Sequence, residues 1–150
     1  MSSRIPEGMD RTFHTEVDHI LEEFERRRQE EKESRLHRKD EWKAAVHEFR
    51  DLAREIVVPT LRELKDPLRS RGLRPYITNN TRQGLNIWLE VDGDQVKPLS
   101  LSFRLDAERR MVEIDGLLQS GAPHRIEVPI DAFDRSVVEV TVVSFLRQLP

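Results

Sequence analysis

The sequence predicts an α+β protein: a long N-terminal helical segment, an antiparallel β-meander of four or five strands, and a C-terminal helix. Two observations carry this prediction. Apolar residues recur at spacings of three and four as far as residue 71, and beyond Gly72 they alternate with polar residues instead. With 150 residues, 35% of them charged, the chain suits a single structural unit that contains extended solvated helix.

The helical segment is predicted to cover residues 10–71, as one rod or as a helix pair, and residues 1–9 are predicted to be disordered. Asp10 or Thr12 could cap its N-terminus. Five large apolar residues then recur at helical spacing: Phe13, Val17, Ile20, Leu21 and Phe24. We name these five residues the apolar stripe, and they predict an amphipathic helix of about four turns.

A charged run, residues 25–41, follows with seven basic and six acidic residues and without glycine or proline. Three acid-before-base pairs at i,i+4 lie in or beside it: Glu22/Arg26, Glu23/Arg27 and Glu31/Arg35. Each such pair stabilises a helix by about 0.2–0.5 kcal/mol, so the run is predicted to be a solvated helix rather than a flexible linker. A turn inside the run, which would fold the first helix back as a hairpin, is the open alternative.

Apolar periodicity returns after the run at eleven positions: Trp42, Ala45, Val46, Phe49, Leu52, Ala53, Ile56, Val57, Leu61, Leu64 and Leu68. We interpret Trp42 and Phe49 as core or seam residues. Pro59 removes one helical hydrogen bond, so we expect a kink or a short break near Val58. Gly72 is a good C-terminal stop for the segment.

Four half-buried strands are predicted from alternation over residues 85–91, 99–105, 111–115 and 125–130, and Tyr76–Thr78 could supply a fifth. The connections between them are short, which favours antiparallel neighbours and a sheet with one apolar face. Residues 42–68, the terminal helix or a partner's copy of either could cover that face.

Residues 132–149 are rich in β-branched residues, which would suit a strand. A strand of that length would be unusual, however, and the preceding Asp131 is a plausible helix cap. We therefore predict a helix here.

Familiar catalytic signatures are missing. The six glycines form neither a dinucleotide fingerprint nor a P-loop, and the chain has no cysteine. His14/Asp18 and His19/Glu23 are spaced so that each pair could reach one metal ion, but they fit the wet face of a helix equally well. We predict no metal and no cofactor and lean against an enzyme, while an enzyme with an unrecognised site remains an alternative.

Charged residues also alternate along the predicted strands. Four carboxylates and two arginines are expected on the outer face of the sheet: Glu90, Glu113, Asp115, Glu127, Arg104 and Arg125. Acid–base chemistry would need at least one desolvated carboxylate, so cross-strand ion pairs are the simpler interpretation.

Residues 65–82 are the one locally basic stretch, with a sum of +4. Six residues in it could bind a phosphate or another anion: Arg69, Arg71, Arg74, Tyr76, Asn79 and Arg82. The alternative is that the arginines cap a helix and solubilise its exit.

Partners are constrained by charge and hydropathy. The net charge is −3 with a pI near 6.0, and the charged run sums to about +1, so we predict no nucleic acid. No apolar run suits a signal peptide or a membrane span, so we expect a soluble cytoplasmic protein. No motif points to a named family.

The apolar stripe supports the leading functional prediction. If helical, the charged run spans about 25 Å and would carry the stripe away from the sheet of its own chain. Five exposed large apolar side chains are seldom left in water. We therefore predict a non-enzymatic interaction module that self-associates through its helices, with a dimer favoured and a protein partner as the other possible occupant.

Overall fold

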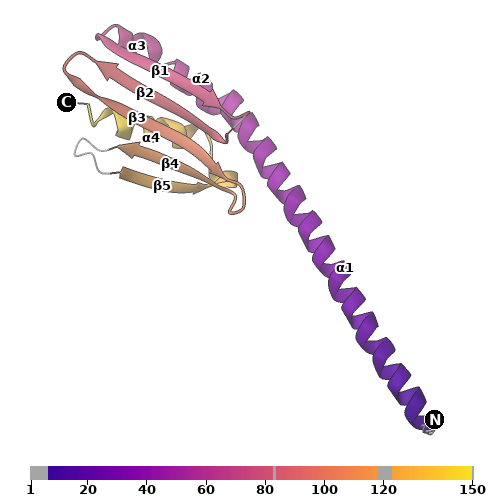
Figure 1. Ribbon diagram of the computed structural model, residues 1–150. Coiled ribbons are helices and arrows are strands. Elements are labelled where there is room, and N and C mark those ends of the chain that lie inside the picture. Colours follow the sequence, from indigo (N-terminus) through magenta and orange to yellow (C-terminus); the bar gives the residue numbers. More distant parts are fainter. Residues whose placement is uncertain (1–6, 83, 118–122, 150) are drawn as a thin grey trace. The chain divides into compact units, whose positions relative to one another are not determined.

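The computed structural model describes residues 7–82, 84–117 and 123–149, and it confirms the α+β fold with five strands and a C-terminal helix (Figure 1). The chain consists of two compact units, Met1–Glu41 and Trp42–Pro150. Helix α1 (Glu7–Leu52) forms the described part of the first unit and continues into the second. Of the nine residues predicted to be disordered, residues 1–6 lie outside the described part, and residues 7–9 are already helical.

The charged run is helical at every position of residues 25–41, as predicted, and it contains no turn. The hairpin alternative is therefore wrong for this structure. Glutamate, arginine and lysine are strong helix formers, and with neither glycine nor proline between them nothing interrupts the backbone hydrogen bonds.

The hydrogen-bond pattern of the helix changes before Pro59. A π-helix (Ala53–Val57) precedes α2 (Val58–Arg62), and the Val58 N–H donates to the carbonyl of Ala53, five residues back. A wider turn gives room to a proline ring that would otherwise meet the carbonyl four residues before it. The expected irregularity is thus present as a π turn, and the chain remains helical through it.

A short helix, α3 (Lys65–Arg69), ends the helical segment. Gly72 follows with a φ of 81°, in the left-handed region that favours glycine, and its N–H donates to the carbonyl of Arg69 over 3.0 Å. The predicted stop at Gly72 is confirmed.

The sheet is an antiparallel meander in which each strand pairs with its neighbours in the chain (Figure 1). Its strands are β1 (Leu73–Asn80), β2 (Asn86–Gly93), β3 (Val96–Asp106), β4 (Met111–Leu117) and β5 (Pro123–Pro129). The register places Ile87 opposite Phe103, and Phe103 opposite Ile114, so their side chains share one apolar face.

The closing helix α4 (Arg135–Leu146) confirms the choice of helix over strand, but its cap was predicted wrongly. Asp134 is the capping residue, and its carboxylate accepts from the Val137 N–H at 3.0 Å. Asp131 lies instead in a 3-10 turn (Ile130–Ala132) and accepts from Arg110 at 3.1 Å. The chain turns here as it leaves β5. The residue with the extended backbone that a cap needs is therefore Asp134, three positions after Asp131.

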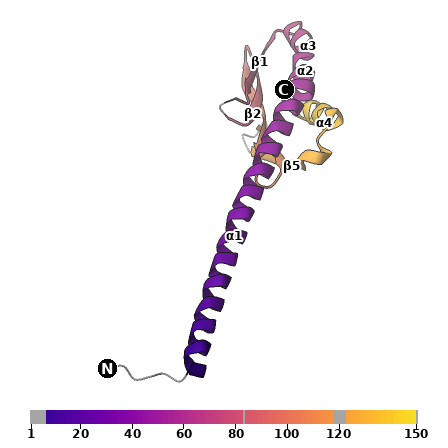
Figure 2. The same ribbon diagram turned by 90° about the vertical axis from the view of Figure 1, so that its right-hand side faces the viewer.

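In the second unit, α2, α3 and α4 all lie on one side of the sheet, where they cover its apolar face (Figure 2). Phe49, Val57 and Leu61 are fully buried in this core together with Phe145 of α4. The covering segments are therefore residues 45–68 and the terminal helix of the same chain. Trp42, which was predicted to be a core or seam residue, is 45% exposed and lies outside this core, so that prediction is wrong for Trp42 and right for Phe49.

Ion pairs and a backbone contact hold the helices to the sheet side and to each other. Arg50 donates to the carbonyl of Thr81 at 2.8 Å, and Arg110 contacts Glu48 at 3.1 Å. Arg135 joins α4 to Glu63 at 2.7 Å. These contacts fix the connections at the edges of the core.

Candidate functional site

The apolar stripe of the first unit is exposed, although its residues are as apolar as those of the core. Phe13 is 61% exposed, Ile20 62%, Leu21 53% and Phe24 59%, while Val17 is half-buried. Helical spacing places all five on one face of α1. No other described residue covers them, so the stripe is an apolar surface available to a partner.

The same helical face continues into the charged run with basic residues. Arg28, Lys32, Arg35 and Lys39 follow Phe24 at spacings of four, four, three and four, so all four lie within about one quarter of the helix circumference. We name these four residues the cationic stripe, and Arg38 lies beside it. All five side chains are exposed.

Three of the six acidic residues of the run, Glu30, Glu33 and Glu41, share the opposite face of the helix. Each of the three has a partner there. Glu33 accepts from Gln29 at 3.2 Å, and an oxygen of Glu41 lies 3.0 Å from Nε2 of His37. These three acids thus lie away from the cationic stripe, whereas Glu25 and Glu31 border it.

Arg26 and Arg27, which lie away from the cationic stripe, are paired with carboxylates. Arg27 contacts Glu23 at 3.5 Å, as the i,i+4 spacing predicted, and Arg26 contacts Glu23 at 3.6 Å and Glu30 at 4.0 Å. The predicted partner of Arg26, Glu22, is thus replaced by Glu23 and Glu30. Within the described part of the chain, no carboxylate lies within 4.0 Å of a charged nitrogen of the cationic stripe, so the predicted Glu31/Arg35 pair does not form.

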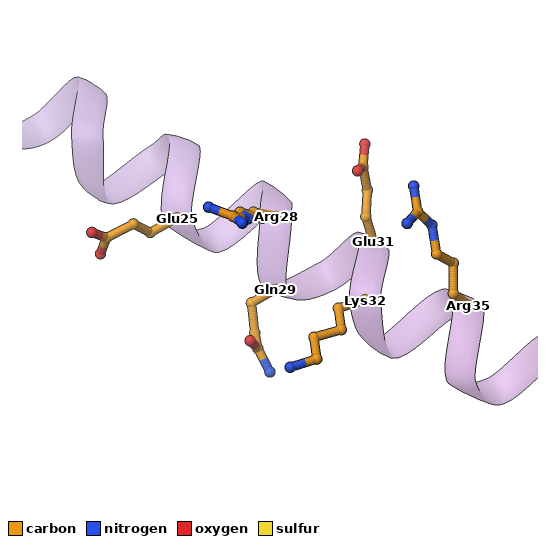
Figure 3. A pocket seen from close by; sticks show the side chains of 6 residues that line it. All are labelled: Glu25, Arg28, Gln29, Glu31, Lys32 and Arg35. Carbon is orange, nitrogen blue, oxygen red and sulfur yellow. The ribbon is translucent and has the colours of Figure 1, made fainter.

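A hollow of about 730 Å³ lies among six side chains of this region: Glu25, Arg28, Gln29, Glu31, Lys32 and Arg35. Figure 3 shows that all six project from a single helix and fan outward from it. The hollow is the space between long solvated side chains rather than an enclosed ligand pocket. Because its six side chains come from one exposed helix, the hollow could not surround a small molecule.

The six residues predicted to bind an anion do not converge. The stretch after Gly72 is strand β1 rather than a loop, so Arg74 lies about 20 Å from the strand end at Asn80, and Arg82 follows in the turn beyond it. Alternation places Tyr76 and Asn79 on opposite faces of that strand. Strand formation thus separates residues that lie close in the sequence.

Several of these six side chains already have partners. Arg74 contacts Asp92 and Asp94, each at 3.4 Å, and the hydrogen bond to Asp92 is the main cause that raises the pKa of its guanidinium. Asn79 accepts from the Thr81 hydroxyl at 2.8 Å. Arg71 donates to the carbonyl of Pro67 at 3.0 Å. Arg69 and Arg82 are exposed at either end of β1, and the anion site stays a prediction.

The outer face of the sheet carries the predicted cross-strand ion pairs. Arg125 contacts Asp115 at 2.8 Å, and the Nε of Arg104 donates to Glu113 at 3.1 Å. Glu127 pairs instead with Arg109 at 2.7 Å, and this hydrogen bond lowers the pKa of the Glu127 carboxyl. Three of the four predicted carboxylates thus form ion pairs across the sheet, whereas Glu90 has no ion pair among the described residues.

A second hollow, about 600 Å³ and open to solvent, lies at one end of this face beside Trp42, Asn86, Arg104 and Glu113. Glu113 is only 5% exposed, but Arg104 satisfies it. The Oδ1 of Asn86 is buried and, within the described residues, has no hydrogen-bond donor. One unpaired amide oxygen beside a satisfied ion pair does not form a catalytic arrangement.

The described residues show neither a cluster of metal ligands nor a membrane-spanning helix. Their histidines and carboxylates form no group of three that could hold a metal ion. None of their helices combines the length and apolarity that crossing a bilayer requires. No protein-family model matches the chain, and no curated protein or solved structure is significantly similar to it.

Sequence reasoning found the apolar stripe but missed the cationic one. It summed the charges of the run and obtained about +1, whereas the relevant signal was the spacing of Arg28, Lys32, Arg35 and Lys39. That spacing repeats the pattern of the apolar stripe, so a helical projection of the sequence would have shown it.

Proposed function

We propose that the protein is a non-enzymatic interaction module that forms a homodimer through the apolar stripe. The observation that supports this most is the exposure of four large apolar side chains, each more than half accessible, on one face of α1. A two-helix contact would remove these side chains from water in both copies at once.

The energetic balance permits a dimer. Complete burial is worth about 1.5–3 kcal/mol for each large apolar side chain, and a pair of stripes contributes ten of them. Burial in a two-helix seam is only partial, and association costs on the order of 4–15 kcal/mol. The apolar gain is of the size needed to exceed this cost, so a dimer of moderate affinity is expected.

Charge favours an antiparallel arrangement of the two helices. In a parallel pair each side chain faces its own copy, so the cationic stripes would oppose each other directly. An antiparallel pair centred between Val17 and Ile20 sets Phe13 against Phe24 of the second copy and carries the cationic stripes to opposite ends. One electrostatic cost remains in this arrangement, because Glu16 and Glu23 flank the seam on the same side and would repel those of the second copy. The charge of Glu23 is offset by Arg26 and Arg27 of its own chain.

Substitution of Phe13 and Phe24 by Glu tests the proposal. The double variant should remain folded and lose self-association, because two charges would enter each half of the seam. The measurement is molar mass by sedimentation equilibrium over a concentration series, together with the helical circular dichroism signal. The parent should rise toward twice the chain mass of 17.7 kDa, whereas the variant should stay at 17.7 kDa.

The matched control is the double variant Thr15→Glu and His19→Glu, which adds the same charge on the exposed opposite face of the helix. It should associate like the parent, apart from a small general repulsion. If both double variants weaken association equally, the effect is one of net charge and the stripe is not the interface.

A further inference from the structure

The cationic stripe places four like charges next to one another on one face of a solvated helix. Like charges at spacings of three and four destabilise a helix, and this stripe contains three such neighbours in succession: Arg28/Lys32, Lys32/Arg35 and Arg35/Lys39. In the described part of the chain, none of these four side chains is paired with a carboxylate, although six acids lie in the same run. The charge of this face is therefore available to a ligand that supplies carboxylates or phosphates.

We infer that the cationic stripe binds an acidic amphipathic helix of a partner protein. The stripe spans about 17 Å along the helix axis, because eleven residues rise 1.5 Å each. A partner helix with acids at spacings of four, three and four would present a carboxylate to each cation over the same length. Glu25 and Glu31 border the stripe, so such a partner would have to approach both of these acidic groups.

The acidic opposite face decides against nucleic acid. An α-helix is about 10–12 Å across and a DNA major groove about 12 Å wide, so a duplex would surround the helix with phosphates. Glu30, Glu33 and Glu41 would then lie near those phosphates and oppose binding. A partner helix contacts only one stripe of its neighbour and does not meet the acidic face.

A similar argument decides against an anionic membrane. Residues 12–24, which carry the apolar stripe that would have to insert, contain four acids and no lysine or arginine: Glu16, Asp18, Glu22 and Glu23. These would be repelled by anionic lipid headgroups. An acidic protein helix would contact only the cationic stripe and would not have to contact residues 12–24.

This inference goes beyond the proposed dimer and does not depend on it. In the antiparallel arrangement Lys32, Arg35 and Lys39 lie beyond the paired apolar stripes, so each copy keeps most of its cationic stripe free. A monomer would offer the same surface. Loss of the dimer and loss of the acidic partner are therefore separate outcomes, measured with different variants.

The test uses the full chain and a synthetic helical peptide of about 25 residues, built on alanine with glutamates at spacings of four, three and four. Binding is followed by fluorescence anisotropy at low ionic strength. A peptide of equal composition with scrambled glutamates, a 30-base-pair duplex and vesicles containing phosphatidylserine complete the set. The patterned peptide should bind more tightly than each of the other three, and its binding should weaken with salt.

Two double variants with the same change of charge locate the surface. Arg28→Gln with Arg35→Gln should weaken peptide binding about fivefold or more, because each exposed charge pair contributes modestly. Arg26→Gln with Arg27→Gln, on the side where these arginines pair with Glu23 and Glu30, should change it less than about twofold. Helical circular dichroism should be unchanged in both, since glutamine is a strong helix former.

Four results would overturn the inference: no binding of the patterned peptide at low salt, equal binding of the scrambled peptide, equal losses in the two double variants, or tighter binding of duplex or vesicles. The last of these would assign the face to nucleic acid or to a lipid surface instead.

Discussion

Phe24 and Phe49 lie on the same helix in stripes of similar spacing, yet their surroundings are opposite. Phe24 is 59% exposed in the first unit, and Phe49 is 0% exposed in the second. Phe49 faces the apolar side of a sheet that the following residues build, whereas no other described residue reaches Phe24. Apolar periodicity therefore identifies a face that tends to be covered, but what covers it depends on the elements within reach.

This comparison also separates two ways of stabilising a helix. In the second unit the buried stripe is stabilised by apolar burial and α4 by its Asp134 cap. In the first unit the described residues rely on helix propensity and on exposed ion pairs such as Glu23/Arg27. Helices of the second kind are only marginally stable alone, so a second copy along the apolar stripe would stabilise the first unit.

The largest expected effect is the difference in unfolding free energy between alanine variants of Phe49 and Phe24. Phe49→Ala should destabilise the fold by about 3–5 kcal/mol, because it removes a fully buried ring and leaves a cavity. Phe24→Ala, measured at a concentration where the chain is monomeric, should leave the unfolding free energy of the second unit unchanged. Urea denaturation monitored by the fluorescence of Trp88, with Trp42 replaced by Phe, reports on the sheet in both variants.

Equal destabilisation by the two alanine variants would show that Phe24 is already covered within one chain. If Phe49→Ala fails to fold, the gentler Phe49→Leu should still cost more than Phe24→Leu.

A smaller effect is expected at the N-terminal cap of α4 in the second unit. Asp134→Ala should cost about 1 kcal/mol, because the first turn of α4 loses the acceptor for the Val137 N–H. Asp131→Asn is the comparison, since it keeps an oxygen for Arg110 and lies outside the cap. The difference is measured as the change in denaturation midpoint, and a larger cost at Asp131 would reinstate it as the important residue.

The sequence alone was sufficient for the order and type of the elements. Alternation predicts the three strands that contain Ile87, Phe103 and Ile114, and Gly72 marks the end of the helical segment. The sequence did not locate the cap of α4, because Asp131 and Asp134 are both suitable residue types. Which of them has the extended backbone that capping needs is decided by the turn after β5.

The candidate sites differ in how far the sequence alone could predict them. The apolar stripe was found because one helix carries it, and helical spacing is a local property. The predicted anion site depended on how the chain runs after Gly72, and strand β1 separates Arg74 from Arg82. The cationic stripe was local and could have been found, but adding the charges of residues 25–41 concealed their arrangement around the helix.

The central claim is that a second copy covers the apolar stripe. Because the chain has no cysteine, Gln29→Cys gives a single site for a spin label, and dipolar spectroscopy then measures only the distance between copies. The antiparallel dimer predicts a distance of about 30 Å, since residue 29 lies roughly ten residues beyond the centre of the pair at 1.5 Å each. A distance below about 20 Å would indicate a parallel pair. The absence of dipolar coupling at concentrations where the unlabelled chain should be dimeric would contradict the claim itself.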